Sequence, residues 1–386
     1  MNMKTDALVV DPMSHVVLVS SDGASDSEIE KLIEASPRLL LSPLSQSSIK
    51  NELTPDAGDL LVVNIQHLTD AEFQLLSDIR AMVPDMPIIV TSQALDADET
   101  RRLFKFSIHD WIPKPINRQD FLDSVFKGIR SRKVFNNKVH AVVSSVGGAG
   151  ATTLAISMAD IAATRMFRKD SVALFDLDFS LGNCGYSLNQ KNNYNLASVA
   201  ATPRRIDAEF IRVIQQKHDH DFFLYSFKHP ELNAEVNSYE LVLRMLDAVS
   251  IEHDQTFLDI PYYETEWKDD VLSAVNTCTL VTELNLPAIK HTIDMIDRIQ
   301  NLRGNDFPLR VVFNKWEASL FGQRISKKRI KELFGDVPFF YIPSATSQIG
   351  EAVDRGVPPS DISARSKFMR AVSKFMKTLE LVEVET

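Results

Sequence analysis

Residues 144–153 read SSVGGAGATT, and this stretch decides how the second half of the chain folds. The whole chain has 13 glycines, and three of them fall within residues 147–150. A β-branched run precedes the stretch at residues 139–144, and a helical pattern follows it at residues 152–167. Glycines between a buried strand and a helix let backbone amides curl around an oxyanion, and the helix N-terminus adds positive potential. The stretch therefore predicts a phosphate-binding loop; a tight glycine turn without a ligand is the alternative.

This loop resembles the deviant Walker A loop of the ParA/MinD superfamily, whose pattern runs Lys-Gly-Gly-x-Gly-Lys-Thr-Thr. Aligned without gaps, Val146 stands in place of the superfamily's signature lysine and Ala151 in place of its phosphate-holding lysine. Thr152 falls where a hydroxyl reaches Mg²⁺. The resemblance implies weak binding of ATP or ADP with Mg²⁺ by the loop and by one later asparagine, a set that consists of Gly147, Gly148, Ala149, Gly150, Ala151, Thr152, Thr153 and Asn314.

The absence of both lysines bears directly on enzymatic activity. A lysine that reaches the β- and γ-phosphates stabilises charge that develops during transfer, and losing one such contact typically costs about 10²–10³ in rate. In this superfamily the signature lysine acts across the dimer, so a second route to hydrolysis is lost as well. The sequence therefore leaves open whether the chain is an enzyme, and it predicts weak or no ATP hydrolysis.

Aspartates at strand ends complete the predicted site. Asp176 and Asp178 match the superfamily's Asp-x-Asp, in which the second carboxylate lies near the attacking water, so Asp178 is the candidate catalytic residue if any activity remains. Asp259 matches a Walker B-like Asp-x-Pro. The predicted metal ligands are Thr152, Asp176 and Asp259. For the Asp176–Asp178 pair taken alone, a helix N-cap followed by a turn is an equal alternative. Asn314 matches the position where the superfamily reads adenine.

Composition limits the choice of function. The 386 residues contain 42 Lys and Arg against 52 Asp and Glu, a net charge of −10 that disfavours binding to a nucleic-acid backbone or an anionic membrane. Two cysteines are too few for a disulfide framework and suit a reducing compartment. No apolar run is long enough for a transmembrane helix, and the N-terminus does not read as a signal peptide. We therefore expect a cytoplasmic protein of two or three domains with no nucleic-acid partner.

Short apolar runs alternate with helical patterns along the chain, which predicts parallel sheets covered on both faces. We expect an α/β fold with two doubly wound domains. The first is an atypical receiver-like (flavodoxin-like) domain over residues 1–130, and the second is a ParA/MinD-like P-loop domain over residues 139–386. The basic and polar residues 131–138 are expected to form the linker.

The front domain resembles a response-regulator receiver that has lost its chemistry. A working receiver needs an acidic pair after its first strand and a phosphate-accepting aspartate after its middle strand. Here Ser20–Ser21 follows the first strand, with only Asp22 nearby, and Asn64 ends the middle strand. An amide is neither a nucleophile for phosphoryl transfer nor a hard anionic ligand, so we expect no phosphorylation. Lys114, which precedes a proline at a late strand end, is expected to be solvated or locally paired.

A degenerate receiver in front of a degenerate ParA/MinD-like domain is the layout of the TadZ/CpaE family, which this chain resembles over nearly its whole length. Residues 172–188 and Arg205–Asp207 also look similar to segments of that family. The resemblance implies a scaffolding protein at the cell pole that helps to assemble the Flp (tight adherence) type IV pilus secretion machinery. It further implies a homodimer and partners among the pilus assembly proteins, including the secretion ATPase.

Two other functions remain as alternatives. An active ParA/MinD-type ATPase that positions DNA or a membrane complex would carry lysines at positions 146 and 151 and a basic face. A phosphorylation-gated regulator is disfavoured by Asn64. The C-terminal stretch Lys367–Leu379 has apolar residues at helical spacing beside lysines. Such a helix can contact a membrane peripherally, but we expect its apolar stripe to pack on its own domain.

Overall fold

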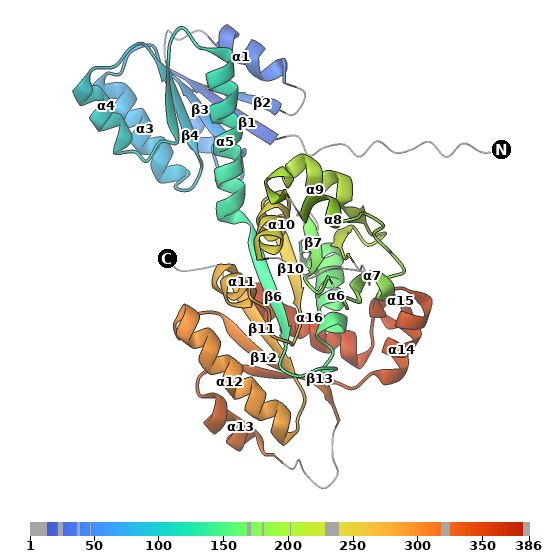
Figure 1. Ribbon diagram of the computed structural model, residues 1–386. Coiled ribbons are helices and arrows are strands. Elements are labelled where there is room, and N and C mark those ends of the chain that lie inside the picture. Colours follow the sequence, from blue (N-terminus) through green and yellow to red (C-terminus); the bar gives the residue numbers. More distant parts are fainter. Residues whose placement is uncertain are drawn as a thin grey trace, which may run out of the picture. The chain divides into compact units, whose positions relative to one another are not determined.

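The computed structural model describes residues 14–21, 26–36, 39–46, 48–167, 171–179, 181–200, 202–227, 239–317 and 325–380. The chain divides into two compact units, residues 1–136 and residues 137–386, and each has its own sheet (Figure 1). We call them the first unit and the second unit.

The first unit is built on a five-stranded parallel sheet in the order β2-β1-β3-β4-β5. Its strands are β1 (Ser14–Ser20), β2 (Leu39–Leu44), β3 (Leu60–Asn64), β4 (Ile88–Ser92) and β5 (Asp110–Pro113). Its helices are α1 (Ser27–Glu34), α2 (Ile49–Glu52), α3 (Asp70–Met82), α4 (Ala97–Phe104) and α5 (Arg118–Asn136). Strands β3 and β4 are buried along their whole length, as a parallel sheet between helix layers requires. This strand order is that of the flavodoxin-like doubly wound fold.

Residues 131–138, expected as a linker, are the last part of α5 and the first residue of β6 (Lys138–Ser144). Only Asn137 separates the two elements. The segment contains no glycine or proline that would end the helix, and basic residues near a helix C-terminus suit its dipole. Arg132 donates hydrogen bonds to the carbonyls of Pro55 and Gly58, so this part of the segment is tied to the first unit.

The second unit contains an eight-stranded sheet in the order β13-β12-β11-β6-β10-β7-β9-β8, in which only β8 pairs antiparallel. The strands after β6 are β7 (Val172–Asp176), β8 (Gln216–Lys217), β9 (Phe222–Tyr225), β10 (Gln255–Ile260), β11 (Thr277–Thr282), β12 (Leu309–Trp316) and β13 (Phe339–Pro343). The helices are α6 (Ala151–Ile161), which continues as a π-turn over Ala162–Met166, α7 (Cys184–Ser187), α8 (Ala197–Ala200), α9 (Ala208–Ile214), α10 (Tyr239–Glu252), α11 (Lys268–Ala274), α12 (Leu286–Arg303), α13 (Lys327–Phe334), α14 (Thr346–Arg355), α15 (Pro359–Ser363) and α16 (Lys367–Glu380).

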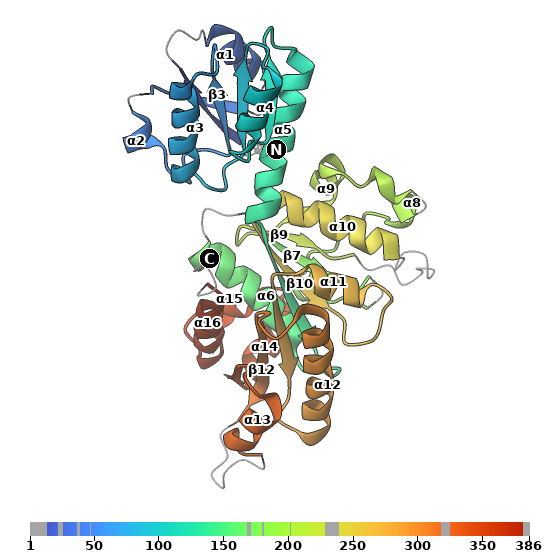
Figure 2. The same ribbon diagram turned by 90° about the vertical axis from the view of Figure 1, so that its left-hand side faces the viewer.

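Two apolar clusters fill the faces of this sheet. One lies between the sheet and helices α10, α11, α12 and α13, and the other lies between the sheet and helices α6 and α16 (Figure 2). Strand β6 runs between β10 and β11, so the loop that follows it opens at the centre of the carboxyl edge of the sheet. Ligands of doubly wound folds bind at this edge.

Helix α16 packs its apolar stripe into the second unit. Phe368, Met369, Val372, Phe375 and Met376 are each no more than 2% exposed. The Phe375 ring meets the Phe340 ring of β13 edge-on, with centroids 5.2 Å apart. The stripe is therefore internal packing, as expected, and is not presented to a membrane. Within the described residues, no helix is both long and apolar enough to cross a bilayer.

Candidate functional site

The loop after β6 has the backbone of an anion-binding turn. Gly148 and Gly150 have φ angles of +79° and +93°, in the left-handed region that favours glycine. Gly150 is the N-cap of α6, and its carbonyl accepts the amide of Leu154. The amides of the first turn of α6, from Ala151 to Thr153, have no partner within the helix because no residue lies one turn earlier. These donors and the helix dipole make the site suitable for phosphate.

Asn314, from the end of β12, braces this loop. Its Nδ2 donates to the carbonyl of Ala149 over 2.9 Å, and the side chain is buried. A Cβ atom at Gly150 would lie 2.4 Å from the same Nδ2, so the close approach requires glycine. The amide predicted to read adenine therefore already supports the phosphate loop.

The two residues that stand in place of lysines are packed against the apolar core. Ala151 is 6% exposed and belongs to the cluster beneath α6. Val146 is half-buried against the same cluster. Tyr262 covers the neighbouring Gly147, where a Cβ would lie 3.3 Å from the tyrosine ring. Neither position offers a charge to a phosphate.

A lysine that the sequence analysis did not consider reaches the loop from another strand. The Nζ of Lys315 donates to the carbonyl of Gly148 over 2.5 Å and pairs with Glu283 at 2.9 Å. Lys315 follows Asn314 directly, where the pairing of β12 with β13 shifts register between Phe313 and Trp316. The sequence signal for Lys315 was its position next to Asn314, the residue predicted to read adenine. A lysine at the end of a strand does not by itself indicate a function.

Three buried groups converge beside the loop. One ligand atom from each of Asp176, Cys184 and Asp259 lies within 4.8 Å of the others. The Thr152 hydroxyl hydrogen-bonds to Asp259, which joins the helix N-terminus to this cluster. The predicted metal ligands Thr152, Asp176 and Asp259 are thus brought together at one edge of the sheet. Cys184 was missed, because the chain returns to Asp176 only through the turn after β7.

The carboxyls of Asp176 and Asp259 are both buried in a low-dielectric site. Burial, followed by the charge of Asp259, raises the pKa of Asp176 to about 8. Burial also raises the pKa of Asp259 to about 6. Burial and the two nearby carboxylates raise the pKa of the Cys184 thiol well above its usual value, so the thiol stays neutral. Among the described residues no Lys or Arg forms an ion pair with either carboxylate. A divalent cation would therefore relieve a real electrostatic cost here.

Hydrogen bonds orient Asp176. Its Oδ2 accepts from the Cys184 amide at 3.1 Å and from the Ser226 hydroxyl at 2.9 Å. Its Oδ1 accepts from the Asp178 amide at 3.1 Å. A Cβ at Gly182 would lie 2.5 Å from Oδ2, so only glycine permits this turn. Asp176 therefore belongs to the buried cluster, and Asp178 forms a turn with it; the catalytic role predicted for Asp178 stays a prediction.

Asp178 has hydrogen-bond partners other than the buried pair. Its Oδ1 accepts hydrogen bonds from the Tyr263 hydroxyl and from the Leu181 amide, both over 2.7 Å. The candidate catalytic residue is thus engaged by a tyrosine and by its own turn. Its proposed role with water remains a prediction.

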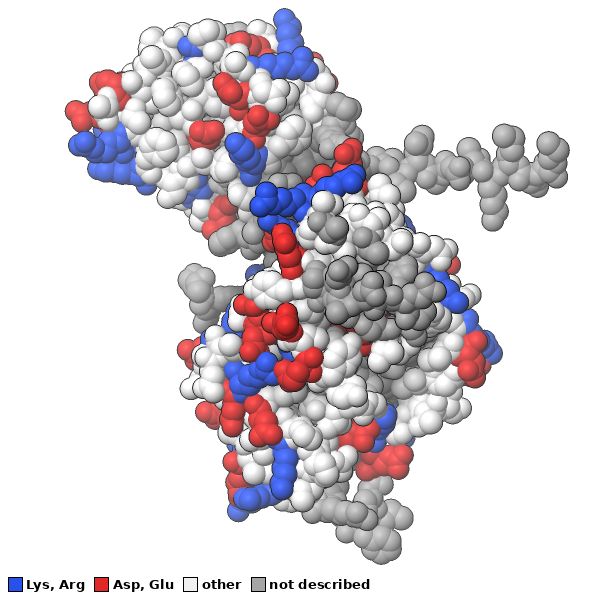
Figure 3. Space-filling view, in the orientation of Figure 1, with Lys and Arg blue, Asp and Glu red and all other residues white. Residues whose placement is uncertain are grey.

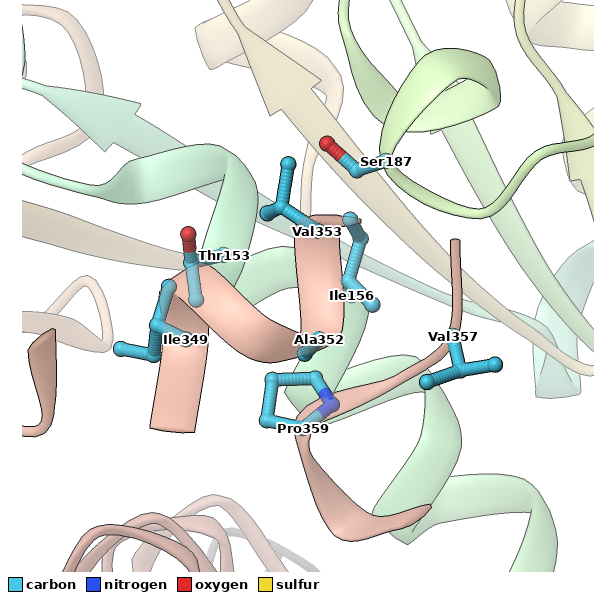
Figure 4. A pocket seen from close by; sticks show the side chains of 8 residues that line it. All are labelled: Thr153, Ile156, Ser187, Ile349, Ala352, Val353, Val357 and Pro359. Atoms are coloured by element: carbon cyan, nitrogen blue, oxygen red, sulfur yellow. The ribbon is translucent and has the colours of Figure 1, made fainter. Parts of the chain in front are cut away.

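Thr153 lies on the other side of the helix start. Its side chain lines a small apolar pocket together with Ile156 of the same helix and with residues of α14 and α15 (Figure 4). The pocket is too narrow for a nucleotide, so the nucleotide contact predicted for Thr153 would have to come from its backbone amide.

The residues of the candidate site fit a Mg²⁺–nucleotide. Hard divalent cations prefer oxygen ligands, which two aspartates and a threonine supply directly or through water. Left-handed glycines at a helix N-terminus suit a diphosphate. The neutral thiol of Cys184 lies at the back of the cluster, where it donates to Asp259 Oδ2 over 3.5 Å.

The sequence predicts a receiver-like pocket without its chemistry at the carboxyl edge of the first unit's sheet, and the side chains at this edge bond to one another. Asn64 Nδ2 donates to Asp26 Oδ1 at 2.8 Å, and Thr91 donates to Asn64 Oδ1 at 3.0 Å. The Ser20 hydroxyl also bonds to Asp26. Asp22, the acid that we expected nearby, lies outside the described residues, and Asp26 provides the carboxylate that fills the pocket.

Lys114 is held at the same pocket. Its Nζ donates to the carbonyl of Ile65 at 3.0 Å. Burial lowers the pKa of this lysine, and the charges of Glu28 and Asp26 oppose that shift. The expectation of a locally paired lysine is confirmed. Asn64, at the position predicted for the phosphate-accepting aspartate, is an amide and is not a nucleophile.

Comparison with known proteins identifies the fold of the second unit. No protein-family profile matches the chain, and no curated protein matches it significantly. Among solved structures, the ParA family ATPase from Chlorobium tepidum TLS matches with a TM-score of 0.55 and 18% identity, covering 63% of this chain and 98% of that one. The cell division ATPase MinD from Pyrococcus furiosus matches with a TM-score of 0.50 and 17% identity, covering 64% and 99%. MinD from Pyrococcus horikoshii OT3, complexed with Mg-ADP, matches with a TM-score of 0.50 and 16% identity, covering 64% and 97%.

The covered share of this chain is close to the share that residues 137–386 make up. The second unit therefore has the P-loop fold of ParA and MinD ATPases, as predicted. The first unit has a separate five-stranded sheet of its own.

Proposed function

We propose that the second unit binds ATP or ADP with Mg²⁺, turns it over slowly or not at all, and uses nucleotide to set the assembly state of a scaffolding protein. The observation that carries this is the convergence of two elements at one sheet edge. The loop of Gly148 and Gly150 opens on the same side as the buried pair Asp176 and Asp259, and the Thr152 side chain is hydrogen-bonded to Asp259.

The ligand class follows from the chemistry of this edge. Amides at a helix N-terminus bind phosphate oxygens, and paired carboxylates bind a hard cation that bridges those oxygens. A MinD structure with this fold holds Mg-ADP, which is the ligand class that we assign here. When bound, Mg²⁺ neutralises phosphate charge; Thr152, Asp176 and Asp259 would hold it.

Slow turnover follows from Val146 and Ala151. Both pack against the apolar cluster under α6, so neither delivers charge to a phosphoryl group in transfer. Asp178 already accepts hydrogen bonds from Tyr263 and Leu181 through Oδ1. Backbone amides and Mg²⁺ remain as the sources of binding energy.

The cellular role that we propose is polar localisation and scaffolding of the Flp (tight adherence) pilus secretion machinery, as in the TadZ/CpaE family. It is supported by the order of the two units and by the loss of chemistry in both. A receiver-like sheet with Asn64 sealed against Asp26 stands before a P-loop unit without its lysines. We propose a cytoplasmic homodimer at the cell pole, with the secretion ATPase and other pilus assembly proteins as partners.

The surface charges of the second unit give little support to the alternative of an active ATPase that binds DNA. On the face of the second unit seen in Figure 3, Lys and Arg side chains are intermixed with Asp and Glu side chains. Nucleic-acid binders concentrate positive charge on one face. Together with the net charge of −10, this favours a protein partner.

Calorimetric titration of the full chain with Mg-ADP and Mg-ATP tests the ligand. We expect binding by the native chain and at least tenfold weaker binding by Gly148→Val, because a β-branched residue cannot hold the left-handed loop without strain. Gly304→Val is the matched control, since Gly304 also has a positive φ (+83°) and open space around its Cα, but it ends α12. A native chain that binds neither nucleotide contradicts the proposal.

The cellular role needs its own test. A fluorescent fusion expressed in place of the native gene should form one focus at a pole, and deletion of the gene should reduce surface pili. Pili of normal number in the deletion strain would remove the pilus assignment and leave the nucleotide site untouched.

A further inference from the structure

Lys315 is placed to supply the charge that the loop lacks. It stands at a register shift of β12, and such bulges re-aim side chains at functional sites. Lys315 is also one of the few non-glycine residues with a positive φ, at +53°. Together these features turn the side chain back over the loop, where Nζ bonds to the carbonyl of Gly148.

The surroundings of this ammonium group favour an anion. Among the described residues, Lys315 is the one Lys or Arg whose side chain bonds to the loop of residues 145–150. Its partners are a neutral carbonyl and Glu283, and its side chain is 51% exposed. A half-exposed lysine with such partners can rotate toward a stronger acceptor at small cost. Phosphate oxygens beside the glycine amides would be that acceptor.

We propose that Lys315 replaces the missing Walker A lysine as the phosphate-contacting cation, delivered from β12 rather than from the start of α6. In the nucleotide-free chain it rests on the carbonyl of Gly148 and on Glu283. With a di- or triphosphate in the loop it contacts a terminal phosphate oxygen, and Glu283 becomes a competitor for the same ammonium. This inference rests on the proposed nucleotide binding of the second unit.

Because Glu283 competes for the ammonium group, removing Lys315 and removing Glu283 should change the nucleotide affinity in opposite directions. A purely structural role of Lys315 would not produce this pattern. Removing the ammonium should weaken nucleotide binding, whereas removing the competing carboxylate should strengthen it. Asn285 Nδ2 lies 3.5 Å from Glu283, so glutamine at position 283 keeps the volume and a polar contact while losing the charge.

The test is calorimetric titration of the full chain with Mg-ADP at fixed ionic strength. We expect Lys315→Met to bind about tenfold more weakly, which is the effect of losing one charge-assisted hydrogen bond. We expect Glu283→Gln to bind severalfold more tightly, and Lys315→Arg to retain most of the affinity. Lys374→Met, which removes an exposed lysine of α16, is the matched control and should bind like the native chain.

The outcomes separate this inference from the proposed function. Native binding with equal affinity in Lys315→Met overturns the role of Lys315 and leaves nucleotide binding standing. Weaker binding by Glu283→Gln also overturns it, because the carboxylate would then be assisting rather than competing. No binding by the native chain overturns the proposed function and this inference with it. Thermal melting of each variant shows whether a loss of affinity reflects a loss of folded protein. If Lys315→Met does not fold, the affinity of Lys315→Arg decides, and it should retain most of the native affinity.

Discussion

The buried pair Asp176 and Asp259 should make the second unit less stable as the pH rises. Both folded pKa values lie above the ordinary value of 3.8, at about 8 and about 6. A carboxyl whose pKa is raised by folding binds more protons in the folded state, so its contribution to stability is complete below pH 4. That contribution is lost as the pH rises first through 6 and then through 8.

The expected change in the free energy of unfolding follows from the one proton that each carboxyl releases. Each raised carboxyl lowers the free energy of unfolding by up to about 1.4 kcal/mol per pH unit within its window. From pH 6 to pH 8 the loss of stability from this pair amounts to about 2 kcal/mol. Asp176→Asn removes this titration, so the steep part of the profile should flatten. An amide facing the Asp178 N–H costs about 1 kcal/mol, so the slope is the diagnostic and the absolute stability is not.

Urea unfolding followed by tryptophan fluorescence measures this slope. Three tryptophans are present, and a Trp111→Phe background leaves Trp267 and Trp316 as reporters of the second unit. Mg²⁺ should reduce the loss of stability at pH 8, because the ion replaces the protons. Asp306→Asn, an exposed carboxyl, is the control and should leave the profile unchanged. An equally steep profile in Asp176→Asn would refute the reasoning about this pair.

Four further outcomes are expected. Asn64→Asp should lower the melting temperature of the first unit in EDTA, because a second carboxylate would face Asp26, and Mg²⁺ should restore the melting temperature. Acetyl phosphate should leave the mass of the native chain unchanged, and an adduct of about 80 Da would contradict the sealed pocket. His220→Ala should cost about 3 kcal/mol of stability, because it leaves the buried Asp160 without its 2.6 Å partner, whereas Lys217→Ala, at an exposed pair, should stay within about 0.5 kcal/mol. Phe375→Ala should cost about 3–5 kcal/mol in urea unfolding, and native protein that cosediments with anionic liposomes as strongly as this variant would show that the α16 stripe is not held inside.

Sequence patterns predicted the strands and most helices because the apolar runs are long and the caps are local. The run predicted as a strand at residues 139–144 is β6, and the helical pattern at residues 152–167 is α6 with its π-turn. Strand β2 has only a weak sequence signal, because Pro43 interrupts its apolar run and most of its residues are only partly buried. The first domain was predicted to end at residue 130, but its last helix, α5, continues to Asn136 because neither glycine nor proline follows Arg130 within it.

The residues of the candidate site also divide into those that the sequence predicts and those that it does not. Loop glycines and strand-end aspartates are placed by spacing along the chain, so their convergence was predictable. Cys184, Lys315 and Asp26 reach their partners across turns or neighbouring strands, and such contacts depend on tertiary geometry. The loss of lysine at positions 146 and 151 was visible in the sequence, but the approach of Lys315 depended on a bulge that no local pattern reveals.

Steady-state release of phosphate from saturating Mg-ATP by the purified native chain tests the central claim most directly. We predict a rate at least a hundredfold below that of a ParA protein with both lysines, measured beside it, since the contact of the signature lysine is lost at Val146 and one such contact costs about that much. Sustained turnover at a rate comparable to that ParA protein, and abolished by Asp178→Ala, would contradict the claim.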